Sequence, residues 1–73
     1  MSKLKVISSS QMCRLLESMG FSAERQRGSH RFFLHPDGRT TVIPMHAGDI
    51  DRALIRKILR DAELSIDEYN SKI

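Results

Sequence analysis

A Pro-Asp-Gly turn at residues 36–38 separates two short runs of apolar and β-branched residues near the middle of the chain. Proline presets one backbone dihedral angle of a tight turn, and the Asp-Gly pair tolerates the unusual angles that follow. The flanking runs, 30–35 and 39–44, therefore predict an antiparallel hairpin. If His35 pairs with Arg39, the numbers of paired residues sum to 74 and His30 lies opposite Pro44, although a slip of one residue stays open.

Residues 21–26 predict a further strand, which Gly28-Ser29 separates from the next one. The three strands should form an antiparallel meander. Strand alternation places Phe32 on one face and Phe33 on the other, so the sequence leaves open which face of the sheet is buried.

A helix is expected before the strands. Ser8 and Gln11 fit a capping box, and Gly20 suits the left-handed position that ends a helix. The helix should span about residues 9–19, with an apolar face made of Met12, Leu15, Leu16 and Met19.

A second helix is expected after the strands, with Asp49 or Asp51 as its N-cap. Ser65 and Glu68 form another capping box, which should open a short C-terminal turn or helix. The apolar face of the second helix consists of Leu54, Ile55, Ile58, Leu59 and Ala62.

The predicted order of elements is α-β-β-β-α. With 73 residues, the chain has room for one domain, residues 1–73. The expected fold is an α+β two-layer domain, in which two helices cover one face of a three-stranded antiparallel sheet. The same order of elements occurs in the double-stranded RNA-binding fold, although fold alone does not fix function.

Charge is concentrated in the middle of the chain. The formal net charge is +3, and residues 25–39 contain Arg25, Arg27, Arg31 and Arg39 with only one acid, Asp37. Such a basic region favours a polyanionic partner. A domain this small also lacks room for a deep cavity, which favours a polymeric substrate or a partner protein over a small metabolite.

Several classes of protein are disfavoured. The single cysteine, Cys13, allows no intramolecular disulfide and no Cys-rich zinc site. No apolar stretch is long enough for a signal peptide or a membrane span, so we expect a cytoplasmic protein without a membrane partner. The acids form no cluster near the scattered histidines, so neither a metal nor another cofactor is expected.

The segment from Arg25 to Arg31 carries the groups that metal-free RNA cleavage needs. The 2′-hydroxyl of RNA is a built-in nucleophile, and histidine suits the proton transfers because its pKa lies near neutrality. Arginine suits the phosphate, Gly28 permits close approach of the backbone, and Ser29 can donate a hydrogen bond. A histidine at a strand start is more often structural than catalytic, so these residues leave both roles of His30 open.

The other two histidines lie at opposite ends of the predicted hairpin. His46 falls at the same end as His30 and is a candidate second acid or base, although a loop or cap role is the more common one. His35 falls at the far end, where a role in stabilising the turn is expected.

Three segments together resemble the HicA toxin family. They are Leu15-Leu16-Glu17 with Gly20-Phe21; Arg27-Gly28-Ser29-His30 with His35-Pro36-Asp37-Gly38-Arg39; and Ile43-Pro44-Met45-His46 before Ile58-Leu59-Arg60. The resemblance spans about residues 6–64. It implies a toxin that cleaves mRNA and that a HicB-type antitoxin neutralises by direct binding. It also implies that His30 is the catalytic histidine.

The chain departs from the family pattern at two places. Residues 47–51 are more acidic than the Gly/Lys-rich loop common in relatives, and Glu63 stands where relatives often have glycine. Neither departure touches His30.

The leading hypothesis is a metal-independent endoribonuclease toxin, with RNA bound by Arg25, Arg27, Gly28, Ser29, Arg31 and Arg39. No direct DNA binding is expected of the toxin alone. The alternatives are a non-catalytic RNA-binding module of the same fold and a protein-interaction domain whose basic face meets an acidic partner.

Overall fold

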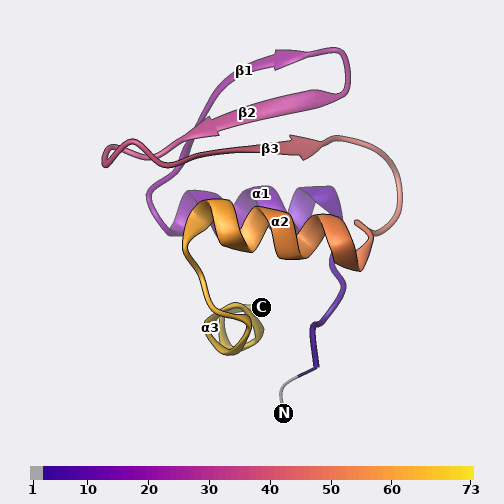
Figure 1. Ribbon diagram of the computed structural model, residues 1–73. Coiled ribbons are helices and arrows are strands. Elements are labelled where there is room, and N and C mark those ends of the chain that lie inside the picture. The colour runs from indigo at the N-terminus through magenta and orange to yellow at the C-terminus, as the bar shows by residue number, and fades with distance from the viewer. Residues whose placement is uncertain (1–2) are drawn as a thin grey trace.

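A computed structural model describes residues 3–73; the first two residues of the predicted domain lie outside the described part. The elements follow the predicted order, with a third helix at the end (Figure 1). They are α1 (Ser9–Ser18), β1 (Ser22–Arg27), β2 (His30–Leu34), β3 (Thr40–Pro44), α2 (Arg52–Ala62) and α3 (Ile66–Lys72).

The strands form one antiparallel sheet in the order β1-β2-β3, and α1 and α2 both lie against one face of it (Figure 1). The predicted α+β fold with two helices on one face is therefore confirmed. The likeness to the double-stranded RNA-binding fold rests on the order of elements alone.

The register of β2 with β3 is the one that the Pro-Asp-Gly turn predicts. His30 pairs with Pro44 and Leu34 pairs with Thr40, without the slip that the sequence left open. The turn itself is closed by two backbone hydrogen bonds, from His35 N to Arg39 O (2.9 Å) and from Gly38 N to His35 O (2.9 Å).

The face of the sheet that the helices cover carries Phe33, Thr41 and Ile43, all of which are buried. Phe33 is 1% exposed, whereas its neighbour Phe32 is half-buried. Phe32 therefore lies on the face that points away from the helices. We call this the open face, and it carries the even-numbered residues of β2 and β3.

Local signals define the helix starts. Ser8 and Gln11 form the predicted capping box of α1, and Ser65 and Glu68 form that of α3. Of the two candidate caps of α2, Asp51 is the N-cap, because its side chain accepts from Leu54 N at 3.0 Å. Asp49 instead pairs with Ser8 in an isolated β-bridge.

The third helix packs on the side of α1 and α2 that is remote from the sheet (Figure 1). Tyr69 is fully buried, and its hydroxyl donates to Lys5 O at 2.7 Å. Asn70 Nδ2 donates to Lys3 O at 2.6 Å. Helix α3 thus fastens the N-terminal segment to the core and adds a small layer to the two that were predicted.

Candidate functional site

The β1–β2 turn, Gly28-Ser29, connects Arg27 directly to its pairing partner His30. Gly28 has a φ of +58°, and glycine at the first of two turn residues suits a tight hairpin of this kind. A Cβ built on Gly28 would meet nothing within 4 Å. Glycine is therefore needed here for its backbone angle, and the space beside the turn is open to a ligand.

His30 is the first residue of β2 and lies on the open face. It pairs with Arg27 on one side and with Pro44 on the other, and directly opposed residues in a sheet project from the same face. The side chain is exposed, and within residues 3–73 the structure gives its imidazole no hydrogen bond or ion pair. Both ring nitrogens are thus available for proton transfer.

A β-bulge brings Arg25 to the same face. The register of β1 against β2 shifts between Ala23 and Arg25, so that Glu24 is the extra residue. Ala23 pairs with Phe33 on the helix side, but Arg25 pairs with Phe32 on the open face. Without the bulge, Arg25 would share the face of Ala23, because residues two apart in a strand alternate back to one side.

Arg25 lies over the ring of Phe32, with its guanidinium carbon 4.8 Å from the ring centroid. Sequence reasoning selected Arg25 but missed Phe32, since two adjacent phenylalanines gave no indication of which one is exposed. The signal that separates them is tertiary: the helices cover Phe33.

Arg31 belongs to the opposite side of the sheet. Its Nε donates to Gln26 Oε1 at 3.0 Å, and its Nη1 lies 3.9 Å from Cys13 Sγ on α1. Burial raises the pKa of the Cys13 thiol, and the Arg31 guanidinium opposes this effect. The structure therefore does not bring Arg31 together with Arg25 and Arg27.

Two hydrogen bonds fix the His30 end of the sheet, and the first of them joins it to the start of α1. Ser9 is 2% exposed, and its Oγ donates to Pro44 O at 2.5 Å. Met45 N donates to Ser29 O at 2.5 Å, which ties the β1–β2 turn to the end of β3. These contacts position His30 without involving its imidazole.

His46 also lies at this end of the sheet, one residue beyond Met45. It is exposed, and its Nδ1 lies 3.0 Å from Ala47 O. The structure thus places His30 and His46 at the same end, but among the described residues it shows no hydrogen bond between their side chains.

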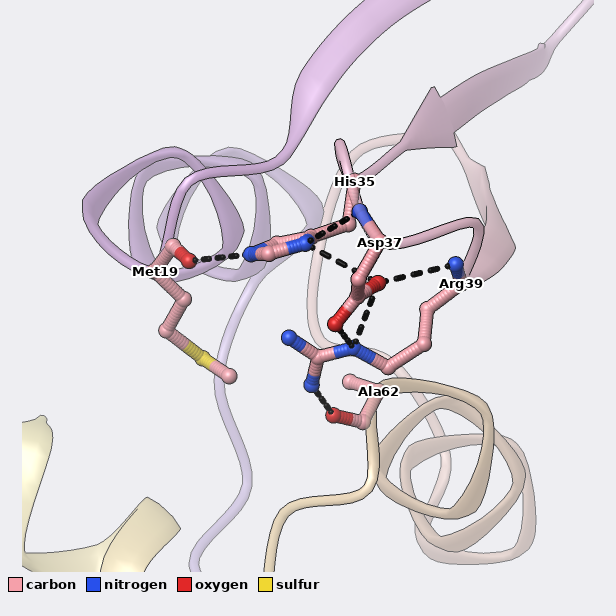
Figure 2. A network of polar contacts seen from close by, with 5 residues as sticks. All are labelled: Met19, His35, Asp37, Arg39 and Ala62. Carbon is pink, nitrogen blue, oxygen red and sulfur yellow. Dashed lines mark hydrogen bonds and ion pairs between the residues drawn. The ribbon is translucent and has the colours of Figure 1, made fainter.

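Arg39 lies at the far end of the hairpin (Figure 2). Its Nε bonds to both carboxylate oxygens of Asp37, at 3.1 and 2.8 Å, and its Nη1 donates to Ala62 O at the end of α2. The guanidinium carbon also lies 5.2 Å from the centroid of the Phe21 ring. Arg39 is thus engaged within the fold, at the end of the hairpin that is remote from Arg27 and His30.

Two further features of the described residues concern groups of metal-binding side chains and helices that could span a membrane. Within residues 3–73, no three His, Cys, Asp or Glu side chains are grouped so that they would hold a metal ion. None of the helices in this range is both long and apolar enough to cross a membrane.

Comparison with curated proteins gave no significant match. A family model described as the HicA toxin of bacterial toxin–antitoxin systems matches residues 9–64. The matched region runs from the start of α1 to just past the end of α2, and it includes the whole sheet and the β1–β2 turn. Because this is well over half of the chain, the protein belongs to the HicA toxin family.

Proposed function

We propose that this toxin is an endoribonuclease that cleaves mRNA without a metal ion, with His30 as its catalytic group. The observation that carries the proposal is the setting of His30. Its imidazole is exposed and unbonded within the described residues, opposite Arg27 and beside an open glycine turn. Family membership supports a toxin of a toxin–antitoxin system, and this setting supports RNA as its target.

The chemistry follows from the groups on the open face. His30 takes the proton of a 2′-hydroxyl, whose oxygen then bonds to the adjacent phosphorus while the bond from phosphorus to the 5′-oxygen breaks. The guanidinium of Arg27 stabilises the negative charge that builds on the phosphate oxygens. The leaving 5′-oxygen takes a proton from an acid, for which His46 is the candidate at this end of the sheet.

The proposed RNA-binding set is narrower than the one the sequence suggested. Arg27 pairs with His30 across the Gly28-Ser29 turn, and Arg25 lies further along the same face; we assign the phosphate contacts to these four residues. Arg31 contacts Gln26 and Cys13 on the helix side, and Arg39 binds Asp37 and Ala62 at the far end. We therefore assign these two arginines to the stability of the fold.

Membership of the family implies a cognate antitoxin. We propose that it is of the HicB type and that it covers the His30 end of the sheet, presenting acids to Arg25 and Arg27. Charge complementarity of this kind mainly speeds association. The mRNA substrate would place the toxin in the cytoplasm.

The test is a pair of matched substitutions, His30→Ala and His46→Ala, at two exposed histidines of the same end. General acid–base catalysis is worth about 10²–10⁴-fold in rate, so His30→Ala should lower RNA cleavage by at least about 100-fold. Its melting temperature should stay that of the wild type, because the exposed imidazole makes no hydrogen bond or ion pair within residues 3–73. Expression of the wild type alone should arrest growth, and His30→Ala should abolish the arrest.

A well-folded His30→Ala protein that still cleaves RNA would remove His30 from the mechanism. Wild-type protein that binds RNA and never cleaves it would favour the alternative, a non-catalytic RNA-binding module. Full activity of His46→Ala would show that another group or water protonates the leaving oxygen.

A further inference from the structure

The open face continues beyond His30 in a second row of side chains. This row consists of three directly paired residues on β1, β2 and β3, namely Arg25, Phe32 and Val42. It lies two residues along each strand from the row of Arg27, His30 and Pro44. Beside this second row lies a shallow hollow of about 400 Å³. Its lining residues are Glu24, Arg25, Phe32, Phe33, Leu34, Thr40, Thr41 and Val42.

Phe32 is the aromatic side chain of this hollow that the core does not bury. No described helix covers the open face, and the contact that the structure gives the ring is with the exposed Arg25. Cation–π contacts at exposed positions are weak, whereas a phosphate forms charge-assisted hydrogen bonds with a guanidinium. A nearby phosphate would therefore draw Arg25 away and leave one face of the ring to another flat group.

We propose that Phe32 and this hollow bind the base of a nucleotide next to the scissile phosphate of single-stranded RNA. Arg25 then binds the phosphate group of that nucleotide. Aromatic side chains on a sheet are well suited to stack against unpaired bases. Phe32 lies two residues from His30 on the same face, about 7 Å along the strand at ~3.3 Å per residue. That separation is within the reach of one nucleotide.

Glu24 makes this hollow unsuitable for a second phosphate group. It is the extra residue of the bulge and the acid among the lining residues. A carboxylate repels a phosphate but accepts hydrogen bonds from the exocyclic amino group of a base. The hollow thus fits a base, and the cations at its border, Arg25 and Arg27, fit the backbone.

This inference rests on the proposed function only for the position of the scissile phosphate, so its test measures binding and not cleavage. Two fluorescent single-stranded probes of equal length are compared by anisotropy. One is a mixed-sequence 2′-O-methyl RNA, which lacks the free 2′-hydroxyl; the other is the same backbone without bases. The proteins are the wild type, Phe32→Leu, Phe32→Tyr and Arg56→Ala, the last being an exposed arginine on α2.

The wild type should bind the probe with bases about tenfold more tightly than the abasic probe, the effect of one stacked base. Phe32→Leu, which keeps an apolar side chain but loses the ring, should bring the ratio close to one while leaving affinity for the abasic probe unchanged. Phe32→Tyr should restore the ratio, and Arg56→Ala should keep it.

Equal losses of affinity for both probes in Phe32→Leu would overturn the proposal, as would a wild type that binds neither probe. A ratio that survives in Phe32→Leu would place the base elsewhere. If Phe32→Leu fails to fold, the test is made on the wild-type protein, by measuring the NMR signals of the Phe32 ring. They should shift on addition of the probe with bases and not with the abasic probe, and the absence of that shift would overturn the proposal. An inactive enzyme that passes these tests would contradict the proposed function and leave the base site standing.

Discussion

The side chains of His35 and Arg39, which flank one β-turn, each donate to the terminal carbonyl of a different helix (Figure 2). His35 Nε2 lies 3.0 Å from Met19 O, at the end of α1, and Arg39 Nη1 donates to Ala62 O, at the end of α2. Since a carbonyl only accepts, Nε2 carries a proton, while Nδ1 lies 3.2 Å from Asp37 N and 3.0 Å from Asp37 Oδ1. The last carbonyls of a helix lack partners within it, and this turn supplies them for both helices.

Asp37 joins the two halves of this arrangement, and its charge should make the stability of the fold depend on pH. Hydrogen bonds from the Arg39 side chain and backbone lower the pKa of Asp37 below its ordinary value of 3.8. A carboxyl group whose pKa is lower in the folded state stabilises the fold above its unfolded-state pKa, and this effect is lost as the pH falls through the folded-state value.

Asp37→Asn should therefore be less stable than the wild type at neutral pH, and the difference should shrink as the pH falls through and below 3.8. Urea unfolding of both proteins across this range measures the difference. A difference that stays constant down to strongly acidic pH would mean that the charge of Asp37 contributes nothing.

The helices α1 and α2 end in the same hydrogen-bonded motif, but only one of them uses glycine. Phe21 N donates to Leu16 O and Leu64 N donates to Leu59 O, which places Gly20 and Glu63 at equivalent left-handed positions. Their φ angles are +97° and +56°. A side chain at such a position costs roughly 1 kcal/mol, because its Cβ approaches the following carbonyl.

Glu63→Gly should therefore stabilise the protein by about 1 kcal/mol and raise the melting temperature by about 4–8 °C. Glu63→Ala is the matched control, because it removes the carboxylate but keeps the Cβ. Equal gains from the two substitutions would attribute the effect to charge at the helix C-terminus and not to the backbone.

The salt dependence of RNA binding should separate the arginines of the open face from the others. Each phosphate contact contributes about −0.7 to the slope of log affinity against log salt for single strands. Arg27→Ala should flatten this slope by about that amount, whereas Arg56→Ala, at an exposed position on α2, should leave it unchanged. A slope that is the same in the wild type and in Arg27→Ala would remove Arg27 from the phosphate contacts.

The products of cleavage should carry the signature of attack by the 2′-hydroxyl. In the presence of EDTA, the protein should still cut RNA, leaving a 2′,3′-cyclic phosphate or 3′-phosphate and a 5′-hydroxyl. DNA should stay intact because it lacks the nucleophile. End-labelling of the products measures both ends; activity that EDTA abolishes and magnesium or manganese restores would contradict the mechanism.

Features of the fold that depend on residues close together in the sequence were predictable. The capping box of Ser8 and Gln11 and the register set by residues 36–38 are local, and both are confirmed. The choice between Asp49 and Asp51 was not predictable, because Asp49 takes part in a bridge to Ser8 that only the assembled fold creates.

In the candidate site, too, local features were predictable from the sequence and features set by tertiary packing were not. The position of His30 at the β1–β2 turn followed from the sequence, but the face on which it lies did not. That face depends on which phenylalanine the helices cover and on the bulge at Glu24, and both are consequences of packing between segments far apart in the chain. The roles of Arg31 and Arg39 were hidden for the same reason, because their partners Cys13 and Ala62 are distant in sequence.

The turn that caps both helices and the turn that carries His30 lie at opposite ends of the sheet, and this separation has a genetic consequence. In a selection for cells that survive expression of the toxin, alleles at residues 35–39 would weaken the fold and should behave as temperature-sensitive, with toxicity returning in the cold. Alleles at His30 or Arg27 would leave the fold intact and stay harmless at every temperature. The temperature profile of each survivor would then report which end of the molecule it altered.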